Sequence, residues 1–492
     1  MDISIELLQI WNFFKQWYWV PLTFIYIAVI FTILIENRNP TKTVAWILVI
    51  IMIPIVGIII YYFFGQDFKK DQYFKKNDKK TSADFIKNWR KINHLIEKDF
   101  EVIEERIGAK VKVFKYLNHS LSSPPFMNCE VKLLQNGEEK FPEFIHAIRN
   151  AKHNIHLEYY IFELDEIGNE IINILIEKAN DGVEVRITTD DFGSPKLNKN
   201  YLELFKNTNV QYQTFLPVKF NSLANSNFRN HRKILIIDGE IAFVGGINIS
   251  DKYINNDSNK LYWRDTSLLI KGEAVNLLQL KFWMDWKMTD GLDFNIFSYD
   301  YIKIHDEVKN GAIVGFAFTT PGAPIQSAME SMILAITLAK KKVRITTPYF
   351  IPSDEFKSAL LIAVNSGVEV ELLMPKNGDS IIVQEASLSF TKKLMEQNVK
   401  VYLYEKGFVH AKTIVVDDDL AFIGTVNLDN RSFFINFELT AIVHDQALIT
   451  KMIADYEQDK RDSSLMTFAM WKNTSIFRRA FASVSRLLAP IL

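Results

Sequence analysis

The sequence predicts an α/β protein made of two tandem copies of one unit, preceded by an N-terminal hairpin of two transmembrane helices. Three observations support this fold class. The order strand, helix, glycine stop, strand occurs twice, with the stops at Gly182 and Gly367. The pattern H-x-K-x4-D-x6-G-[G/T]-x-N also occurs twice, beginning at His231 and at His410. Two long runs without charge precede both copies.

The two copies predict two similar halves, 126–295 and 296–470, related by a pseudo-two-fold axis. Strands that alternate with helices favour mixed β-sheets with helices on both faces. In the first half we expect a strand, a helix and a strand at Ile155–Phe162, Gly168–Asn180 and Val183–Thr188. In the second half the same elements are expected at Val343–Thr347, Ser353–Asn365 and Val368–Met374.

The N-terminal segment 1–66 contains two apolar runs, Trp17–Ile35 and Val44–Phe64, that carry no charged residue. At 1.5 Å per residue each run is long enough to cross a bilayer core as a helix. Aromatic residues lie at the ends of the runs, as they do at membrane interfaces. The alternative is a pair of buried core helices. We expect a membrane hairpin closed by the short connector Glu36–Thr43.

A group of lysines follows the second run, whereas the connector carries only Arg38 and Lys42. The lysines are Lys69, Lys70, Lys75, Lys76, Lys79 and Lys80. By the positive-inside rule this asymmetry places the C-terminal bulk in the cytoplasm. The lysines can contact anionic lipid headgroups or form a solvated linker. Segment 67–125 as a whole is predicted to be a charged helical neck.

The C-terminal segment 471–492 predicts a basic amphipathic helix over Ile476–Leu488. Its apolar face comprises Phe477, Ala480, Phe481, Val484, Leu487 and Leu488, and its arginines are Arg478, Arg479 and Arg486. Such a helix can lie in a membrane interface. The alternative is a helix that packs on the catalytic body.

Charge and cysteine content exclude some classes of protein. A net charge of −1 gives the whole molecule no attraction to nucleic acid. The single cysteine, Cys129, excludes an internal disulfide, and we expect it to be buried in a protein of a reducing compartment. The pair Asp190-Asp191 is expected to form a strand-end turn rather than a metal site. His153 and His156 are expected to be core or surface histidines.

The two repeated motifs have the pattern of buried strands, since Ile234–Ile237 and Thr413–Val416 are β-branched or apolar. Side chains at i and i+2 share one face of a strand, so each motif points a histidine and a lysine the same way. These pairs are His231 with Lys233 and His410 with Lys412. A lysine held at a buried site beside a histidine needs an anion. Two facing pairs therefore predict a phosphate site between two imidazoles.

This arrangement suits a two-step displacement at phosphorus without a metal or cofactor. One imidazole attacks phosphorus and the other protonates the leaving oxygen. The downstream positions expected to contact the phosphate are Asn248, Asn427, Gly246 and Thr425. Asp238 and Asp417 complete the candidate catalytic motifs, but their odd offsets from the histidines predict that they face away and anchor the strand ends.

Each motif is followed by an acidic residue, Asp265 or Glu438. A carboxylate that accepts a hydrogen bond from one histidine nitrogen fixes the tautomer of the ring. We expect this orienting role, with a structural ion pair as the alternative. Glu158 and Tyr349 come at matching strand positions of the two halves and can line the same site.

The duplicated motif resembles that of the phospholipase D superfamily and, within it, the two-span membrane family of bacterial cardiolipin synthases. The phrases that carry the closer resemblance are Thr43–Trp46 with Pro54 and Gly57, Asn136–Pro142, His156–Ile161, Asn230–Lys233, Thr347–Pro352 and Asn427–Ser432. They extend over nearly the whole chain. Many second motifs in the superfamily carry serine where Thr425 stands, and the hydroxyl is kept here.

The resemblance implies that one phosphatidylglycerol gives its phosphatidyl group to the enzyme and a second accepts it, forming cardiolipin and glycerol. It implies that His231 is the nucleophile and His410 the acid/base. Some relatives pair each histidine with the acidic residue of the other half, which would put Glu438 beside His231 and Asp265 beside His410. The implied location is the bacterial plasma membrane, with several passes.

Three alternatives remain open from the sequence. A related transphosphatidylase or a phospholipase D hydrolase would use another acceptor, such as serine, ethanolamine or water. A nuclease fits poorly, because the neutral charge and membrane hairpin suit lipid better than nucleic acid. A non-catalytic lipid-binding protein is the alternative from a different class, and the two complete motifs count against it.

Overall fold

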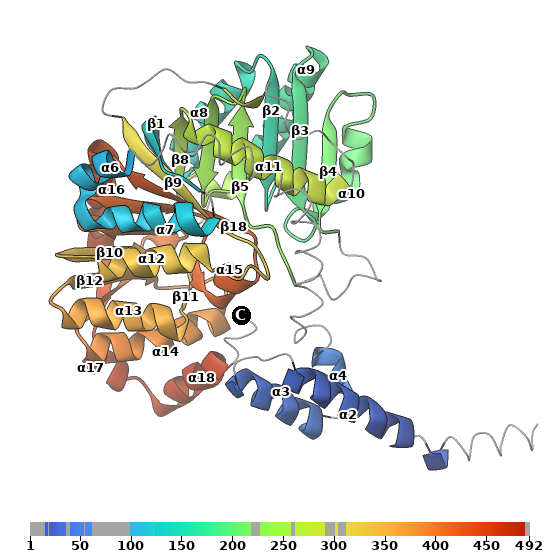
Figure 1. The fold of residues 1–492 in the computed structure, drawn as a ribbon, viewed down its shortest axis with the longest axis vertical. Coiled ribbons are helices and arrows are strands. Elements are labelled where there is room, and N and C mark those ends of the chain that lie inside the picture. The colour runs from blue at the N-terminus through green and yellow to red at the C-terminus, as the bar shows by residue number, and fades with distance from the viewer. Residues whose placement is uncertain are drawn as a thin grey trace, which may run out of the picture. The chain divides into compact units, whose positions relative to one another are not determined.

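The computed structural model describes residues 15–17, 19–35, 40–53, 55–61, 99–121, 123–217, 227–256, 261–290, 301–303 and 311–487 (Figure 1). The chain divides into two compact units. One unit is N-terminal and comprises Met1–Tyr73 with Lys219–Asn227. The other, called here the catalytic body, comprises Phe74–Val218 and Phe228–Leu492.

The first apolar run forms helix α2 (Trp19–Ile35), whose side chains are largely exposed. It belongs to a 21-residue helix, Lys15–Ile35. Among the described residues, this is the one helix that is long and apolar enough to cross a membrane. The first predicted span is therefore a helix of the required length and composition.

The second apolar run differs from the expected single span. It forms α3 (Pro40–Met52) and α4 (Val56–Ile60), with Ile55 between them at a φ of 59°. The sequence places Pro54 at this break, and proline cannot continue a helix because it lacks the N–H and clashes with the preceding turn. The Tyr26 hydroxyl of α2 accepts the Ile55 N–H at 2.7 Å. The connector residues 36–39 and all six lysines of 69–80 lie outside the described residues.

The catalytic body is organised on one 15-stranded sheet, in which the two halves meet at neighbouring strands β1 and β9 (Figure 1). From this centre the strands of the first half are β1 (Phe126–Gln135), β8 (Thr266–Lys271), β6 (Ile241–Gly245), β5 (Lys233–Ile237), β2 (Asn154–Tyr159), β3 (Glu184–Asp190) and β4 (Gln211–Phe215). Those of the second half are β9 (Ala312–Thr319), β18 (Glu438–His444), β16 (Leu420–Gly424), β15 (Thr413–Val416), β10 (Lys342–Thr346), β12 (Glu369–Pro375), β13 (Lys400–Tyr404) and β19 (Ser463–Met466).

The pairing in the two halves confirms the duplication. In the first half β2 is parallel to β3 and antiparallel to β5, and in the second half β10 is parallel to β12 and antiparallel to β15. Two short sheets join β11 (Phe350–Ile351) to β17 (Leu428–Asp429) and β7 (Tyr262–Arg264) to β14 (Gly407–Val409). The second of these links crosses from one half to the other.

Helices cover both faces of the sheet, as predicted. Alternate residues of β5 show this, since Ile234 packs in a core with Trp283 of α11, while Leu235 packs in another core with Phe144 of α8. The helices of the first half are α8 (Asn136–Arg149), α9 (Glu166–Asn180), α10 (Pro195–Leu204) and α11 (Ala274–Asp290). Those of the second half are α12 (Ser327–Thr337), α13 (Asp354–Asn365), α14 (Ile381–Glu396), α15 (Asn430–Phe434), α16 (Gln446–Arg461), α17 (Phe468–Lys472) and α18 (Ile476–Leu487).

The described part of the predicted neck belongs to the catalytic body. Helices α6 (Asp99–Ile107) and α7 (Val111–Leu121) contribute Ile103 and Phe114 to the core of the second half. A short 3-10 turn, Gly108–Lys110, joins the two helices. Cys129 is buried, in agreement with the expectation from the sequence.

Candidate active site

Each motif histidine lies directly before the central strand of its half, and its backbone is held by the opposite half. The His231 N–H donates to the carbonyl oxygen of Phe437 at 2.9 Å. The His410 N–H donates to the carbonyl oxygen of Arg264 at 2.7 Å. The acceptors are the residues that precede Glu438 and Asp265 in the sequence. The chain therefore brings each histidine alongside the acidic residue of the other half.

The side chains complete these crossed pairs. Nδ1 of His231 lies 2.9 Å from Oε2 of Glu438, and Nδ1 of His410 lies 2.7 Å from Oδ2 of Asp265. Burial acts to raise the pKa of both carboxyl groups. The charges of Lys412 and His410 outweigh burial at Asp265, and the charge and hydrogen bond of His231 help to outweigh it at Glu438. The pKa of each carboxyl group is therefore lowered. An ionised carboxylate can only accept a hydrogen bond, so Nδ1 carries the proton in each ring. Nε2 is then the nitrogen that remains for chemistry.

The two motif lysines are buried beside the histidines. The ammonium groups of Lys233 and Lys412 donate to the backbone carbonyls of His231 and His410, the first of them at 2.7 Å. Burial lowers the pKa of Lys412 to about 8 and that of Lys233 well below its usual value. Neither lysine is among the residues that line the pocket, so they act on a bound anion through their charge, and two ammonium groups that are costly to bury create a preference for an anion nearby.

The charges of the two motifs act on each other. Burial, together with the charges of Lys412 and Lys233, lowers the pKa of His410 to about 3, although the neighbouring Asp265 acts to raise it. The pKa of His231 is also lowered by burial, with contributions from both lysines. The free site therefore holds neutral imidazoles at neutral pH. A phosphodiester bound between the lysines would offset their charge and raise the pKa of both histidines.

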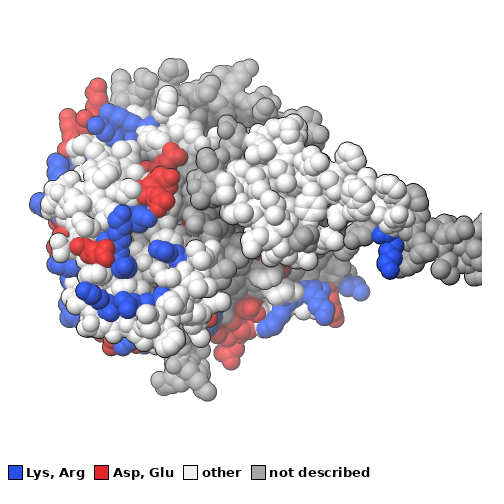
Figure 2. Space-filling view, turned by 90° about the horizontal axis from the view of Figure 1, so that it is seen from below, with Lys and Arg blue, Asp and Glu red and all other residues white. Residues whose placement is uncertain are grey.

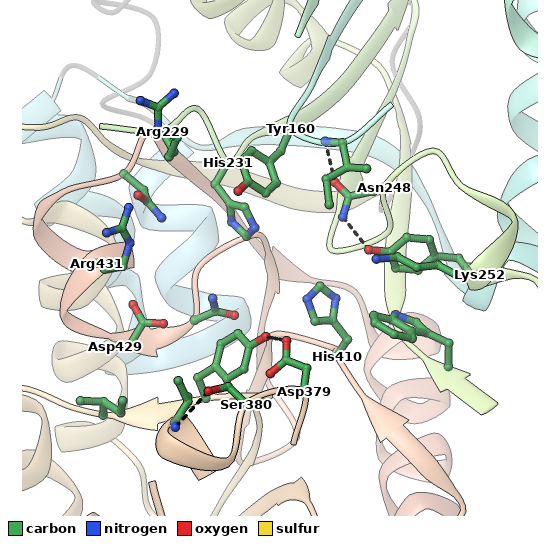
Figure 3. Close-up of a pocket in the computed structure, with 18 residues that line it drawn as sticks. Tyr160, Arg229, His231, Asn248, Lys252, Asp379, Ser380, His410, Asp429 and Arg431 are labelled. Carbon is green, nitrogen blue, oxygen red and sulfur yellow. Dashed lines mark hydrogen bonds between the residues drawn. The ribbon is translucent and has the colours of Figure 1, made fainter. Parts of the chain in front are cut away.

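A pocket of about 390 Å³ contains both imidazoles, which approach it from opposite sides (Figure 3). Its lining residues come from both halves and are Tyr160, Ile161, Arg229, His231, Asn248, Lys252, Tyr253, Trp263, Tyr349, Ile351, Asp379, Ser380, Val383, His410, Asn427, Asp429, Arg431 and Asn436. The motif pattern on its own could not identify three of the cations there, Arg229, Lys252 and Arg431. The one available signal was the Asn427–Ser432 phrase, which contains Arg431.

The two motif asparagines, Asn248 and Asn427, line this pocket. Nδ2 of Asn248 donates to the Tyr253 hydroxyl at 2.6 Å, and its Oδ1 accepts the Ile161 N–H at 3.2 Å. Oδ1 of Asn427 is buried without a hydrogen-bond partner among the described residues. A buried polar atom of this kind is costly unless it is satisfied by another group, such as a bound ligand.

Gly246 and Thr425 were expected to contact the phosphate, but the structure places both against the carboxylates and neither lines the pocket. A Cβ atom at Gly246 would lie 2.2 Å from Oδ1 of Asp265. At the equivalent position of the second half, the Thr425 hydroxyl donates to Oε2 of Glu438 at 2.5 Å. These motif positions therefore make room for, or hold, the carboxylate that orients the opposite histidine.

The two motif aspartates face away from the pocket and hold strand ends. The Asp238 carboxylate accepts the backbone N–H groups of Lys152, His153 and Asn154. The Asp417 carboxylate accepts those of Lys340, Lys341 and Lys342. It also forms an ion pair with Lys110 at 2.7 Å. Both aspartates therefore fix the strands that carry the histidines, with no contact to the reacting atoms.

Other residues singled out from the sequence fall outside the pocket, with one exception. Tyr349 lines it and donates a hydrogen bond to Asp379. Glu158 instead lies buried behind it and accepts from Nδ2 of Asn230 at 2.6 Å. Asp190 caps a turn by accepting the backbone N–H groups of Phe192 and Gly193.

His153 and His156, the two non-motif histidines considered in the sequence, do not line the pocket. The His156 ring stacks on Phe282 with a centroid separation of 4.7 Å in the core of the first half. His153 is exposed at the surface. Neither ring contacts the reacting groups, in agreement with the expectation from the sequence.

Comparison with known proteins identifies related chains. The family model described as "Cardiolipin synthase, PLD-like domain" matches residues 144–286 and 332–460, and the model "Phospholipase_D-nuclease N-terminal" matches residues 24–66. The cardiolipin synthase of Alkalihalophilus pseudofirmus is 40% identical over 476 residues, which are 96% of this chain and 92% of the relative. The cardiolipin synthase of Staphylococcus aureus is 36% identical over 468 residues, or 94% of each chain.

A solved structure has the same fold. The phosphatidylserine synthase of Haemophilus influenzae matches 78% of this chain and 100% of its own length with a TM-score of 0.60. The sequence identity is 17%, so the likeness concerns the fold alone. The catalytic body therefore shares its overall fold with that structure.

Proposed function

This chain belongs to the family of cardiolipin synthases with phospholipase D-like domains, and from that premise we propose that it makes cardiolipin. The reaction is a reversible transfer of a phosphatidyl group from one phosphatidylglycerol to another, with release of glycerol. The substrates are therefore membrane phospholipids. Nucleic acid is not a substrate in this proposal.

The observation that carries the proposal is the crossed pairing of the two motif histidines. Each Nδ1 is held by an ionised carboxylate of the other half, so both Nε2 atoms are available in the same pocket. One nitrogen can attack phosphorus while the other handles the proton of the glycerol oxygen. Nucleophilic attack and proton transfer thus require two imidazoles in one site, and the two copies of the motif provide them.

In the first step, Nε2 of His231 attacks the phosphorus of the donor phosphatidylglycerol. A bond forms between nitrogen and phosphorus, and the bond from phosphorus to the glycerol oxygen breaks. His410, protonated at Nε2 in the charged complex, gives that proton to the departing glycerol. Lys233 and Lys412 stabilise the negative charge that develops on the phosphoryl oxygens.

In the second step, the glycerol hydroxyl of the acceptor phosphatidylglycerol loses its proton to Nε2 of His410 and attacks phosphorus. The nitrogen–phosphorus bond breaks, so His231 is restored and cardiolipin is released. The assignment of His231 as the nucleophile rests on the family resemblance of the first-half motif. In this scheme Asn248 and Asn427 contact the phosphoryl group as neutral polar partners.

The family and the apolar α2 helix agree with a membrane-associated protein. Within the proposal, the chain is a multi-pass protein of the bacterial plasma membrane, with its catalytic body on the cytoplasmic side. The orientation is supported by the six lysines that follow the second apolar run in the sequence.

Chemical trapping tests the two-step mechanism. The full-length protein is incubated with phosphatidylglycerol that is isotopically labelled at phosphorus, quenched in alkaline denaturant, and mapped by peptide analysis. We expect label on the peptide that contains His231 and none in the His231→Ala variant. Label on His410 would reverse the two roles, and cardiolipin formation without any labelled histidine would exclude the covalent intermediate.

Product analysis separates cardiolipin synthesis from the alternative activities. With phosphatidylglycerol as the sole substrate, the proposal predicts cardiolipin and free glycerol in equal amounts. Phosphatidic acid without cardiolipin would identify a hydrolase. New lipid formed only after addition of serine or ethanolamine would identify another transphosphatidylase. No turnover with intact motifs would support a non-catalytic lipid-binding role.

A further inference from the structure

Helix α18 packs on the catalytic body by a narrow face and leaves its apolar face exposed. Ala482 and Ser485 are buried in the packing against α14. Phe477 and Leu487 are 84% and 74% exposed, and Phe481 and Val484 are also exposed. The sequence left two possibilities open, a helix packed on the body and a helix in a membrane interface. In the structure α18 packs on the catalytic body, and its exposed apolar side chains are still available to contact a membrane interface.

A basic pocket of about 460 Å³ lies between α14, α17 and α18. Its lining residues are Ser389, Lys392, Phe468, Trp471, Lys472, Ile476, Arg479, Ala480, Ser483 and Arg486. Four of them are cations and none is acidic. Figure 2, a view from below the orientation of Figure 1, shows lysine and arginine side chains as well as acidic ones, with uncharged surface between them.

The charges around this pocket favour an anion. Nε of Arg479 is buried and has no hydrogen-bond partner among the described residues. The nearby carboxylate of Glu385 is already engaged by Arg478 at 2.9 Å, and that of Glu396 lies 4.0 Å from the exposed ammonium of Lys392. The pocket therefore offers several cationic donors with little internal neutralisation, which suits a phosphate group.

Helix α14 connects this basic pocket with the catalytic pocket. Its N-cap, Ser380, lines the catalytic pocket, whereas Lys392 lines the basic one. Twelve residues of helix correspond to roughly 18 Å at 1.5 Å per residue. Ile381, next to the catalytic pocket at the start of α14, is 74% exposed. One lipid surface can therefore contact the apolar residues near both pockets.

We propose that α18 lies in the headgroup layer of the membrane and that the basic pocket binds the phosphodiester of an anionic phospholipid. The exposed side chains Phe477, Phe481, Val484 and Leu487 enter the boundary between headgroups and acyl chains. The four cations, Lys392, Lys472, Arg479 and Arg486, hold the lipid phosphate. Apolar insertion combined with basic residues is the pattern of interfacial helices. This site is separate from the catalytic histidines and requires only an anionic lipid, whichever reaction the catalytic pocket performs.

A depth-sensitive label on α18 tests the proposal in the full-length chain. The only native cysteine is replaced by Cys129→Ala, turnover is prevented by His410→Ala, and Val484→Cys is labelled with an environment-sensitive fluorophore. The protein is reconstituted in nanodiscs of phosphatidylcholine alone or with phosphatidylglycerol. We expect a blue-shifted emission and at least twofold stronger quenching by lipid-borne quenchers when phosphatidylglycerol is present.

The triple variant Lys472→Gln, Arg479→Gln and Arg486→Gln should abolish this lipid-dependent difference. A matched control replaces Lys178, Lys199 and Lys206 of the first half by glutamine and should leave the difference intact. Circular dichroism and thermal unfolding verify that each variant is folded. A label that stays accessible to water-soluble quenchers in both nanodiscs would overturn the proposal. So would a shift produced equally by inorganic phosphate with phosphatidylcholine alone, or an unchanged shift in the triple variant.

Discussion

Asp265 and His410 belong to opposite halves of the chain, yet Oδ2 of Asp265 lies 2.7 Å from Nδ1 of His410. The equivalent pair, Glu438 and His231, crosses in the other direction. Each histidine is therefore oriented by a carboxylate of the other half. The site needs both copies of the duplicated unit for this reason. The crossing also makes each carboxylate a specific target for mutation.

Replacing Asp265 by asparagine should lower kcat by about 10³- to 10⁴-fold, because the new amide can donate to Nδ1 and stabilise the wrong tautomer of His410. KM should change much less, since the lysines that attract the phosphate remain. Steady-state synthesis from phosphatidylglycerol measures both parameters. Asp181→Asn, at an exposed helix end, is the matched control and should retain full activity. Near-normal kcat in Asp265→Asn would contradict the orienting role.

The two catalytic histidines should behave as one unit. His231→Ala and His410→Ala are each expected to lower turnover by at least about 10⁴-fold, and the double variant should be no worse than either single one. The physical reason is that attack and proton transfer belong to the same step. Initial rates of the three variants, measured at equal protein concentration, provide the comparison. Multiplicative losses in the double variant would show that the two rings act independently.

Much of this site was predictable because short-range geometry determines it. The odd offset of Asp238 from His231 predicts that it turns away toward backbone amides. The structure shows the expected anchoring of Asp238. The expected sharing of one strand face by His231 and Lys233 was less accurate, because His231 precedes β5 and Lys233 does not line the pocket. The crossed pairs could not be derived from spacing, since they depend on how the segment before each motif strand contacts the opposite half, His231 at Phe437 and His410 at Arg264. Only the family resemblance raised that possibility.

Other features required the folded chain. The hydroxyl of Thr425 could have contacted a phosphate, and its hydrogen bond to Glu438 depends on the neighbouring strand β18. Arg229 and Lys252 line the pocket from outside the motifs, where no periodic pattern identifies them. The break in the second apolar run, in contrast, had a visible cause in Pro54, which counting uncharged residues does not take into account.

The pH dependence should report the buried lysine of the second motif. With the pKa of Lys412 at about 8, its ammonium group is charged below that pH and neutral above it. A neutral amine cannot stabilise the phosphoryl oxygens, so kcat/KM should decline more steeply above about pH 8. Lys412→Arg keeps its charge throughout, so its profile should lack this break even if its activity is low. A break at the same pH in both proteins would assign it to another group.

Gly246→Ala should lower kcat by about 10²-fold, because the added Cβ would lie 2.2 Å from Oδ1 of Asp265 and displace the carboxylate that holds His410. Thr425→Ser is the matched conservative change in the other half and should remain near wild type, since it keeps the hydroxyl that contacts Glu438. Activity and thermal unfolding of both variants are compared. Full activity in Gly246→Ala would mean that the carboxylate tolerates displacement.

Arg232 links the two halves of the catalytic body through buried hydrogen bonds, so replacing it should lower the stability of the fold. The side chain is fully buried and forms an ion pair with Asp285 of its own half. Across the interface, Nη2 donates to the carbonyl oxygen of Thr319 at 2.9 Å, and Nε donates to that of Glu438 at 3.1 Å. Its removal leaves Asp285 with Lys281 as its remaining ionic partner, at 3.0 Å.

We therefore expect Arg232→Met to cost about 3 kcal/mol of stability, the lower end of the usual penalty for removing one member of a buried ion pair, because Lys281 still pairs with Asp285. The measurement is denaturant or thermal unfolding of the detergent-solubilised protein. The double variant Arg232→Met with Asp285→Leu should be no more stable than Arg232→Met, because it leaves the buried ammonium group of Lys281 without its carboxylate partner. An unfolding midpoint that Arg232→Met leaves unchanged would show that the remaining contacts between β9 and β1 hold the halves together without this arginine.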